Sequence, residues 1–72
     1  MSEQDRLILA VENERERQGL SARQVSEKSG WSHNAMYRLM RGQTSLMKFL
    51  DICKVLGIRV ELFDKTGRRI TG

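Results

Sequence analysis

The stretch from Ser21 to Gly42, SARQVSEKSGWSHNAMYRLMRG, most constrains the fold, because it reads as two short helices joined by a sharp turn. Ser21 followed three residues later by Gln24 is a capping box, in which each side chain accepts a hydrogen bond from the other residue's backbone amide. Gly30 supplies the left-handed residue that ends a helix. We therefore predict a helix over residues 22–29 and a second helix that begins almost at once.

The second helix is predicted from His33 to Arg41, with Ser32 as its N-cap. Its apolar side consists of Ala35, Met36, Leu39 and Met40. The other side carries hydrogen-bonding side chains: His33, Asn34, Tyr37, Arg38 and Arg41. A second helix this short, with donors and acceptors near its N-terminus, is typical of a helix-turn-helix, whose second helix enters the major groove of DNA.

The segment resembles the helix-turn-helix of the Cro/C1-type (XRE) family, whose pattern runs roughly Q-x-x-L-A-x-x-x-G-x-S-x-x-x-I-S-x-x-E-x-G. The pattern reappears here through Val25, Ser26, Gly30, Ser32, Met36, Arg38 and Gly42. The segment from Ser45 to Ile58, SLMKFLDICKVLGI, is similar without a gap to the family's fourth helix, of the type SLETLLKIAKALGV. The resemblance covers most of the chain and implies a lambda-repressor-like bundle that binds DNA.

Two positions depart from that family pattern. Glu14 stands where relatives usually carry an inward leucine or valine, and Met40 stands where they usually carry a glutamate. In many relatives a basic residue matching Arg15 pairs with that glutamate. We therefore expect Arg15 to pair with Glu12, three residues earlier, or with water.

Two further helices flank the motif. Residues 5–18 predict the first helix, with Leu7, Ile8 and Val11 facing inward and Gly19 ending it. After Gly42, Thr44 or Ser45 can cap a helix that Gly57 ends. The predicted inward stripe of this last helix is Leu46, Phe49, Leu50, Cys53 and Leu56, with Cys53 as a small buried filler. Trp31, in the turn, is predicted to pack over the motif and not to stack on a base.

Four side chains of the second helix are candidates for contacts with DNA bases: His33, Asn34, Tyr37 and Arg38. Asn34 can pair with N6 and N7 of adenine, and Arg38 with O6 and N7 of guanine. His33 can donate to or accept from a base edge, and Tyr37 can reach a thymine methyl group or a phosphate. The alternative is an ordinary solvated helix face. We expect base contacts because so much of the family pattern surrounds these residues.

The candidates for phosphate contacts lie at exposed helix starts and in the turn after the second helix: Ser21, Arg23, Ser32, Arg41, Gln43, Thr44 and Ser45. Free backbone donors and the helix dipole favour an anion at such starts. The alternative is ordinary helix capping. The family usually places a phosphate-binding glutamine where this chain has Ala22, so Arg23 or Ser21 would have to replace that contact.

The C-terminal segment, IRVELFDKTGRRI, changes from helical to alternating spacing after Gly57. The alternation and the turn sequence DKTG predict a strand, or a hairpin. A lone hairpin is at best marginal in water, so its apolar face needs the helices or a second copy of itself. The segment resembles the C-terminal strand of HipB-type antitoxins, which joins two subunits. We therefore predict a DNA-binding domain over residues 1–57 and a dimerisation element over residues 58–72, acting through Ile58, Val60 and Leu62.

Composition limits the class of protein. A chain of 72 residues forms one domain and buries only about 60% of its unfolded surface, so pairing of two chains would help its stability. The formal charge of +4 and the isoelectric point near 9.8 favour an anionic partner. With one cysteine and one histidine we expect neither a disulfide nor a zinc site, and no cofactor. Without a long apolar run or a signal peptide, we expect a cytoplasmic protein that does not contact the membrane.

The sequence thus predicts a mainly α fold, a lambda-repressor-like bundle of four to five helices with a C-terminal β-strand or hairpin. The expected function is sequence-specific binding to double-stranded DNA, by a homodimeric repressor that occludes a palindromic operator. An alternative stays open, in which the chain is an antitoxin-like subunit that holds a toxin partner protein and regulates its own operon. No catalytic constellation is present in the sequence, so we do not expect an enzyme.

Overall fold

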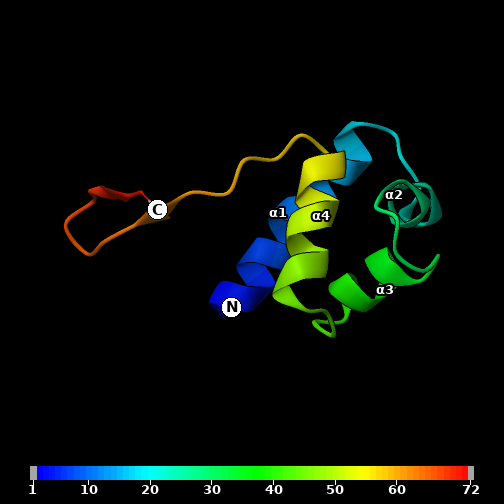
Figure 1. Ribbon diagram of the computed structural model, residues 1–72, viewed down its shortest axis with the longest axis horizontal. Coiled ribbons are helices and arrows are strands. Elements are labelled where there is room, and N and C mark those ends of the chain that lie inside the picture. The colour runs from blue at the N-terminus through cyan, green and yellow to red at the C-terminus, as the bar shows by residue number, and fades with distance from the viewer. Residues whose placement is uncertain (1, 72) are drawn as a thin grey trace.

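The computed structural model describes residues 2–71, which form four helices and a C-terminal two-stranded antiparallel hairpin (Figure 1). The helices are α1 (Glu3–Arg17), α2 (Ala22–Lys28), α3 (Ala35–Met40) and α4 (Leu46–Val55), and the strands are β1 (Leu62–Phe63) and β2 (Arg69–Ile70). The predicted mainly helical bundle with a C-terminal hairpin is confirmed.

Helix α3 contacts each of the other three helices. A helix of six residues is not stable alone in water, so packing must hold it in place. Its inward residues Met36 and Leu39 are completely buried. The buried apolar residues of the whole core are Val11, Ala22, Val25, Ala35, Met36, Leu39, Ile52, Cys53 and Leu56.

The start and end of α2 follow the sequence prediction. The hydroxyl of Ser21 accepts the backbone N–H of Gln24 at 3.0 Å, and the backbone N–H of Ser21 donates to Oε1 of Gln24 at 2.7 Å. Both halves of the capping box are therefore formed. Gly30, at a φ of +82°, lets the chain leave the helix and turn toward α3.

The start of α3 differs from the prediction, because the helix begins at Ala35 and Ser32 is not its N-cap. The carbonyl oxygen of Ser32 accepts the N–H of Ala35 at 3.0 Å in a tight turn. Asn34 occupies the N-cap position, but its side chain makes no capping bond. The hydroxyl of Ser26, in α2, accepts the N–H of Met36 at 2.8 Å. A side chain from the neighbouring helix therefore does what a local cap was predicted to do.

Four apolar residues that were predicted to face inward are exposed instead: Leu7, Met40, Leu46 and Leu50. Cys53 in α4 and Leu56 at its C-cap are buried as predicted. Ile52, which was not predicted to face inward, is also buried, so the inward stripe is rotated relative to the prediction. Leu46, exposed by 73%, lines an open groove beside Leu7 of α1. No fifth helix among residues 2–71 covers this side of the bundle, which leaves these side chains in contact with solvent.

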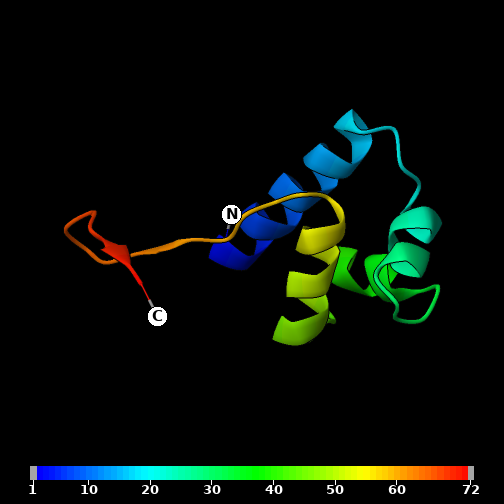
Figure 2. The same ribbon diagram turned by 45° about the horizontal axis from the view of Figure 1, so that its top comes forward.

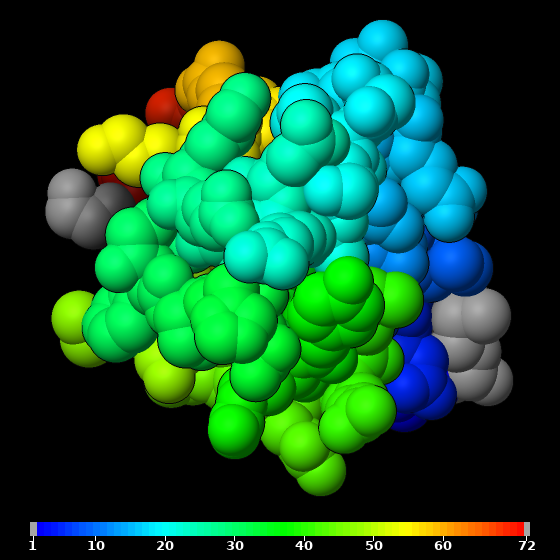
Figure 3. All heavy atoms as spheres, turned by 90° about the vertical axis from the view of Figure 1, so that its right-hand side faces the viewer, coloured from blue at the N-terminus to red at the C-terminus, as the bar shows by residue number. Residues whose placement is uncertain are grey.

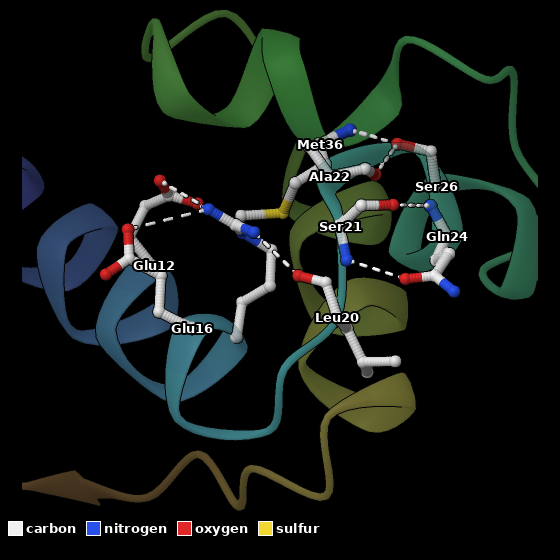
Figure 4. Close-up of polar contacts among 9 residues, drawn as sticks. Glu12, Glu16, Leu20, Ser21, Ala22, Gln24, Ser26 and Met36 are labelled. Carbon is white, nitrogen blue, oxygen red and sulfur yellow. Dashed lines mark hydrogen bonds and ion pairs between the residues drawn. The ribbon is translucent and has the colours of Figure 1, made fainter.

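The predicted pairing of Arg15 with Glu12 is confirmed. Nε and Nη2 of Arg15 donate to the two carboxylate oxygens of Glu12 at 2.9 and 3.2 Å. Nη1 of Arg15 donates to the carbonyl oxygen of Leu20 at 2.7 Å (Figure 4). The hydrogen bonds that Arg15 donates to the Glu12 carboxylate raise the pKa of the Arg15 guanidinium. The arginine therefore joins α1 to the loop that leads into α2.

The hairpin extends away from the helices in both ribbon views (Figures 1 and 2). Leu62 pairs with Ile70 and Phe63 pairs with Arg69. In the turn between the strands, the Asp64 carboxylate accepts the backbone N–H and hydroxyl of Thr66 at 2.9 and 2.7 Å. The predicted turn sequence thus closes a hairpin.

The strand is shorter than the alternation of residues 58–62 predicted. Ile58 is partly buried against the helical core, directly after the turn at Gly57. Val60 and Leu62 are exposed, and only Leu62 lies in β1. The alternation therefore begins in a connecting segment and not in a strand, because the first residue of the series belongs to the core of the helices.

None of the helices within residues 2–71 is long and apolar enough to cross a membrane.

Candidate nucleic-acid interface

The outer surface of α3 and the loop after it enclose a polar hollow. Its lining residues are Asn34, Tyr37, Arg38, Arg41 and Gln43. All five are exposed. Three of the residues predicted to contact bases and two of those predicted to contact phosphates therefore share one surface. Figure 3 shows the end of the molecule where α2 and α3 lie, with residues 20–42, cyan to green, covering most of it.

Two arginines at this hollow carry charges without a carboxylate partner. Among the ion pairs formed by residues 2–71, none includes Arg38 or Arg41. Arg23, near the start of α2, differs because its Nε lies 2.9 Å from Oε1 of Glu27. Both members of that pair are exposed, and such pairs contribute about 1 kcal/mol or less, so a phosphate could displace the glutamate.

The turn at the end of α3 brings Gln43 to the hollow. Gly42 has a φ of +73°, which favours glycine. The N–H of Gln43 donates to the carbonyl oxygen of Arg38 at 2.8 Å, and the N–H of Gly42 donates to that of Leu39 at 2.9 Å. These two bonds are the Schellman arrangement at a helix end. The chain therefore reverses over the last turn of α3 and places an amide side chain beside its arginines.

Other predicted contact residues lie outside the hollow. Ser32 and His33 are exposed in the turn before α3 but do not line it. Thr44 is half-buried, and with Ser45 it lines the groove between α1 and α4 instead. The structure therefore brings together the predicted residues of α3, its N-cap Asn34 and the loop after it, and leaves Ser32 and His33 outside the hollow.

Serine hydroxyls cap the starts of α2 and α4, as predicted. The hydroxyl of Ser45 accepts the N–H of Lys48 at 3.3 Å, and the hydroxyl of Ser21 has the same role in α2. A hydroxyl that accepts a hydrogen bond still has a proton to donate. Capping and phosphate contact are therefore compatible at both helix starts, and the two interpretations of these serines do not exclude each other.

Trp31 packs against α4 from the turn between α2 and α3. Its Nε1 donates to Oδ2 of Asp51 at 2.8 Å. The ammonium of Lys48 lies 5.0 Å from the centroid of its ring, within the range of a cation–π contact. These contacts hold the turn on α4 at the surface, where Trp31 is exposed by 37%. Packing over the motif itself stays a prediction.

Ser26 supports this interface from within the core, a role that the sequence did not predict. It is the buried polar residue within the described part of the chain, and its hydroxyl touches both α2 and α3 (Figure 4). The sequence held a signal at this position, because Ser26 falls on the family pattern directly after Val25. Small residues are common at such positions, so that signal did not indicate a hydrogen bond to the next helix.

The lone cysteine takes no part in the interface. Cys53 is buried in α4, and desolvation by burial raises the pKa of its thiol. A raised thiol pKa disfavours the reactive thiolate. This agrees with the predicted role of a buried filler. Within residues 2–71 no cluster of His, Cys, Asp or Glu side chains could hold a metal ion.

Two short helices joined by a glycine-containing turn, with the polar face of the second one exposed, define a helix-turn-helix domain. A family model described as a helix-turn-helix domain matches residues 11–65, from within α1 to just beyond β1. The chain belongs to this helix-turn-helix domain family. No curated protein matches the sequence. Membership of the family supports a role as a DNA-binding regulator.

Proposed function

We propose that the chain is a sequence-specific transcription regulator that binds double-stranded DNA as a homodimer and represses transcription. The observation that carries the proposal is the polar hollow on α3, in which Asn34, Tyr37 and Arg38 lie beside Arg41 and Gln43 on a helix-turn-helix domain. Within residues 2–71 Arg38 and Arg41 form no ion pair, so both charges are available to an anion. DNA offers phosphates to such charges and base edges to the neighbouring polar side chains.

In the proposed complex α3 lies in the major groove. Asn34 pairs with N6 and N7 of adenine, and Arg38 pairs with O6 and N7 of guanine. Tyr37 reaches a thymine methyl group or a phosphate, and His33 approaches a base edge from the turn before the helix. The supporting fact is that all four are exposed. His33 does not line the hollow, so we assign it to a base edge without naming the base.

Phosphates of the two DNA strands are held on either side of α3. On one side we propose Arg41 and Gln43 at the hollow, with the start of α4 at Ser45. On the other side we propose the start of α2, where Ser21 caps the helix and Arg23 is exposed. Thr44, which is half-buried, and Ser32 in the turn would be secondary contacts. The exposed helix starts favour anions through their free backbone donors.

The hairpin is the proposed dimerisation element. Residues directly opposite each other on paired strands share a face, so Leu62 and Ile70 form one apolar face of the hairpin. They are exposed by 64% and 54%. A two-stranded sheet with an apolar face open to water is unstable alone, and a second copy would cover it and pair its free strand edges. Val60 would extend this face, and Ile58 would fix the segment to the helical core.

Repression follows from the dimer by exclusion. The hairpin and the α2–α3 pair lie at opposite ends of the molecule (Figure 1), so a dimer formed through the hairpins leaves both copies of α3 open to DNA. Two such helices related by a two-fold axis read a palindromic site. A bound dimer would block polymerase or another regulator at an overlapping promoter. The resemblance to Cro/C1-type regulators, and of the tail to HipB-type antitoxins, supports this arrangement.

Selection of bound sequences from a pool of random duplexes tests the proposed function. We expect the pool to converge on a palindrome whose half-sites are spaced by a turn of DNA, about 34 Å, or a multiple of it. Convergence on a single unpaired half-site would keep the reading of DNA sequence but contradict the dimer. No enrichment above the starting pool would contradict sequence-specific binding.

Sedimentation of the full chain tests the proposed dimer. Leu62→Asp buries a charge in the proposed interface, so it should convert the dimer to a monomer at micromolar concentration. Thr71→Asp adds the same charge outside the strands of the same hairpin, and should leave the dimer intact. A chain truncated after Gly57 should also be a monomer. If it still folds and dimerises, the interface lies on the helices, through Phe49 or Met47. A full chain that is monomeric throughout would favour the antitoxin-like alternative, in which the hairpin holds a different protein.

A further inference from the structure

The hydroxyl of Ser26 occupies an unusual place for a polar group. The residue is completely buried, with an exposed fraction of 0%. Burial of a hydroxyl is unfavourable unless its hydrogen bonds are made. Both are made here, because Oγ donates to the carbonyl oxygen of Ala22 at 2.8 Å and accepts the N–H of Met36 at 2.8 Å (Figure 4).

The two partners of Ser26 lie at the starts of two different helices. Ala22 is the first residue of α2 and follows the N-cap Ser21, where we place a phosphate contact. Met36 is the second residue of α3 and follows the turn that carries Asn34, where we place a base contact. One buried hydroxyl therefore joins the first turn of α2 to the first turn of α3.

Nothing else in the described residues replaces this bond at the start of α3. The Asn34 side chain makes no capping bond, and the carbonyl oxygen of Ser32 is used by the N–H of Ala35. A helix of six residues has few internal hydrogen bonds, so its position depends on what its ends contact. The buried side chains of Met36 and Leu39 pack α3 against the core, and the hydroxyl of Ser26 adds a directional bond that fixes the start of α3 relative to α2.

We infer that Ser26 is the positioning residue of the recognition helix, and that it determines the selectivity of DNA binding without touching DNA. The inference rests on the proposed function. Hydrogen bonds to base edges need donor–acceptor distances of about 2.7 to 3.2 Å, so a small displacement of α3 removes them. Contacts of flexible arginines with phosphates tolerate the same displacement. Loss of the hydroxyl should therefore reduce discrimination between sequences more than it reduces binding to DNA in general.

The test compares Ser26→Ala with the parent chain and with Cys53→Ala. Cys53 is buried in α4, and its substitution perturbs the same core without removing a bond between α2 and α3. Dissociation constants are measured for a duplex selected from a random pool and for a scrambled duplex of equal length, at a temperature where circular dichroism shows each variant folded. For Ser26→Ala we expect the ratio of the two constants to fall about tenfold, the discrimination that one base contact gives. For Cys53→Ala we expect the ratio of the parent.

A second variant and a second measurement cover the case in which Ser26→Ala does not fold. Ser26→Cys is nearly isosteric and has only a weakly accepting sulfur, so its ratio should lie between those of the parent and of the alanine variant. Amide hydrogen exchange should show that Met36 loses protection in both variants, relative to Val25 in the same core. A folded Ser26 variant with the parent's ratio, or an equal loss in Cys53→Ala, would overturn the inference. If the parent itself prefers no duplex, the proposed function fails, and the exchange of the Met36 amide still reports whether the hydroxyl holds α3.

Discussion

Replacement of Arg15 by alanine should destabilise the fold far more than replacement of an exposed arginine of α1. Three hydrogen bonds are lost, two to Glu12 and one to the carbonyl oxygen of Leu20. The side chains of Arg15 and Glu12 are exposed by only 13% and 16%. The glutamate would be left without its partner in a place where water replaces that partner poorly.

The magnitude follows from this burial. Removing one partner of a fully buried ion pair costs about 3–5 kcal/mol, and exposed pairs contribute about 1 kcal/mol or less. Because the pair retains some contact with solvent, we expect about 2–3 kcal/mol for Arg15→Ala. For a domain of this size, 1 kcal/mol corresponds to about 4–8 °C in Tm, so Tm should fall by about 10–20 °C.

Arg6→Ala is the matched control. Arg6 pairs with Glu3, three residues earlier on the same helix, but the two side chains are exposed by 68% and 70%. Its loss should change Tm by only a few degrees. Both variants are followed by thermal unfolding with circular dichroism. If Arg15→Ala lowered Tm no more than Arg6→Ala does, the argument that Arg15 secures the loop between α1 and α2 would be wrong.

Two other predictions concern the interface and the response to acid. Arg38→Ala and Asn34→Ala should each weaken binding to the selected duplex by about 1–3 kcal/mol and relax the preference at one base pair, whereas Arg41→Ala should weaken all duplexes evenly, as fluorescence anisotropy can measure. Equal weakening of selected and scrambled duplexes by Arg38→Ala would refute its assignment to a base. Hydrogen bonds from Arg17 lower the pKa of Glu14 from 4.5 to about 2. The stability that the ionised Glu14 provides is complete above pH 4.5 and is lost as the pH falls toward 2. Glu14→Gln should therefore flatten the decline of Tm between pH 4.5 and 2. An unchanged dependence of Tm on pH would contradict the lowered pKa of Glu14.

The parts of the fold that sequence could predict are those set by residues close together in the chain. The capping box of Ser21 and Gln24 spans three residues, and the glycine at position 30 ends its helix through its own backbone conformation. The pairing of Arg15 with Glu12 also lies within one helical turn. Such interactions need no knowledge of the tertiary structure, so the pattern of residues is sufficient.

The predictions that were wrong depended on contacts between distant segments. Ser32 was a suitable N-cap by residue type, but Ser26, ten residues before Met36, made the bond instead. Leu46 and Leu50 fit a helical stripe equally well, and only the placement of α2 and α3 against α4 decides that Ile52 faces the core. Periodicity gives the spacing of an apolar face, but it does not give the rotation of a helix against its neighbours.

The sequence predicted which residues of the candidate interface are exposed better than it predicted how their side chains lie relative to one another. Periodicity identified Tyr37 and Arg38 as exposed, and both are. That Gln43 joins them in one hollow follows from the turn at Gly42, whose bonds to α3 reverse the chain. Thr44, two residues after that glycine, is turned toward α1 instead. The sequence places Gln43 and Thr44 in one loop, but it does not indicate which of the two side chains faces the hollow.

The dependence of duplex binding on salt tests most directly whether this domain holds DNA through its basic interface. Each phosphate neutralised by an arginine or lysine releases a counterion, so the logarithm of the binding constant falls linearly with the logarithm of salt concentration. For a dimer that makes several phosphate contacts per subunit, we expect affinity for the selected duplex to fall by orders of magnitude between roughly 50 and 200 mM salt. Affinity that does not change with salt, or no binding to any duplex, would contradict the account.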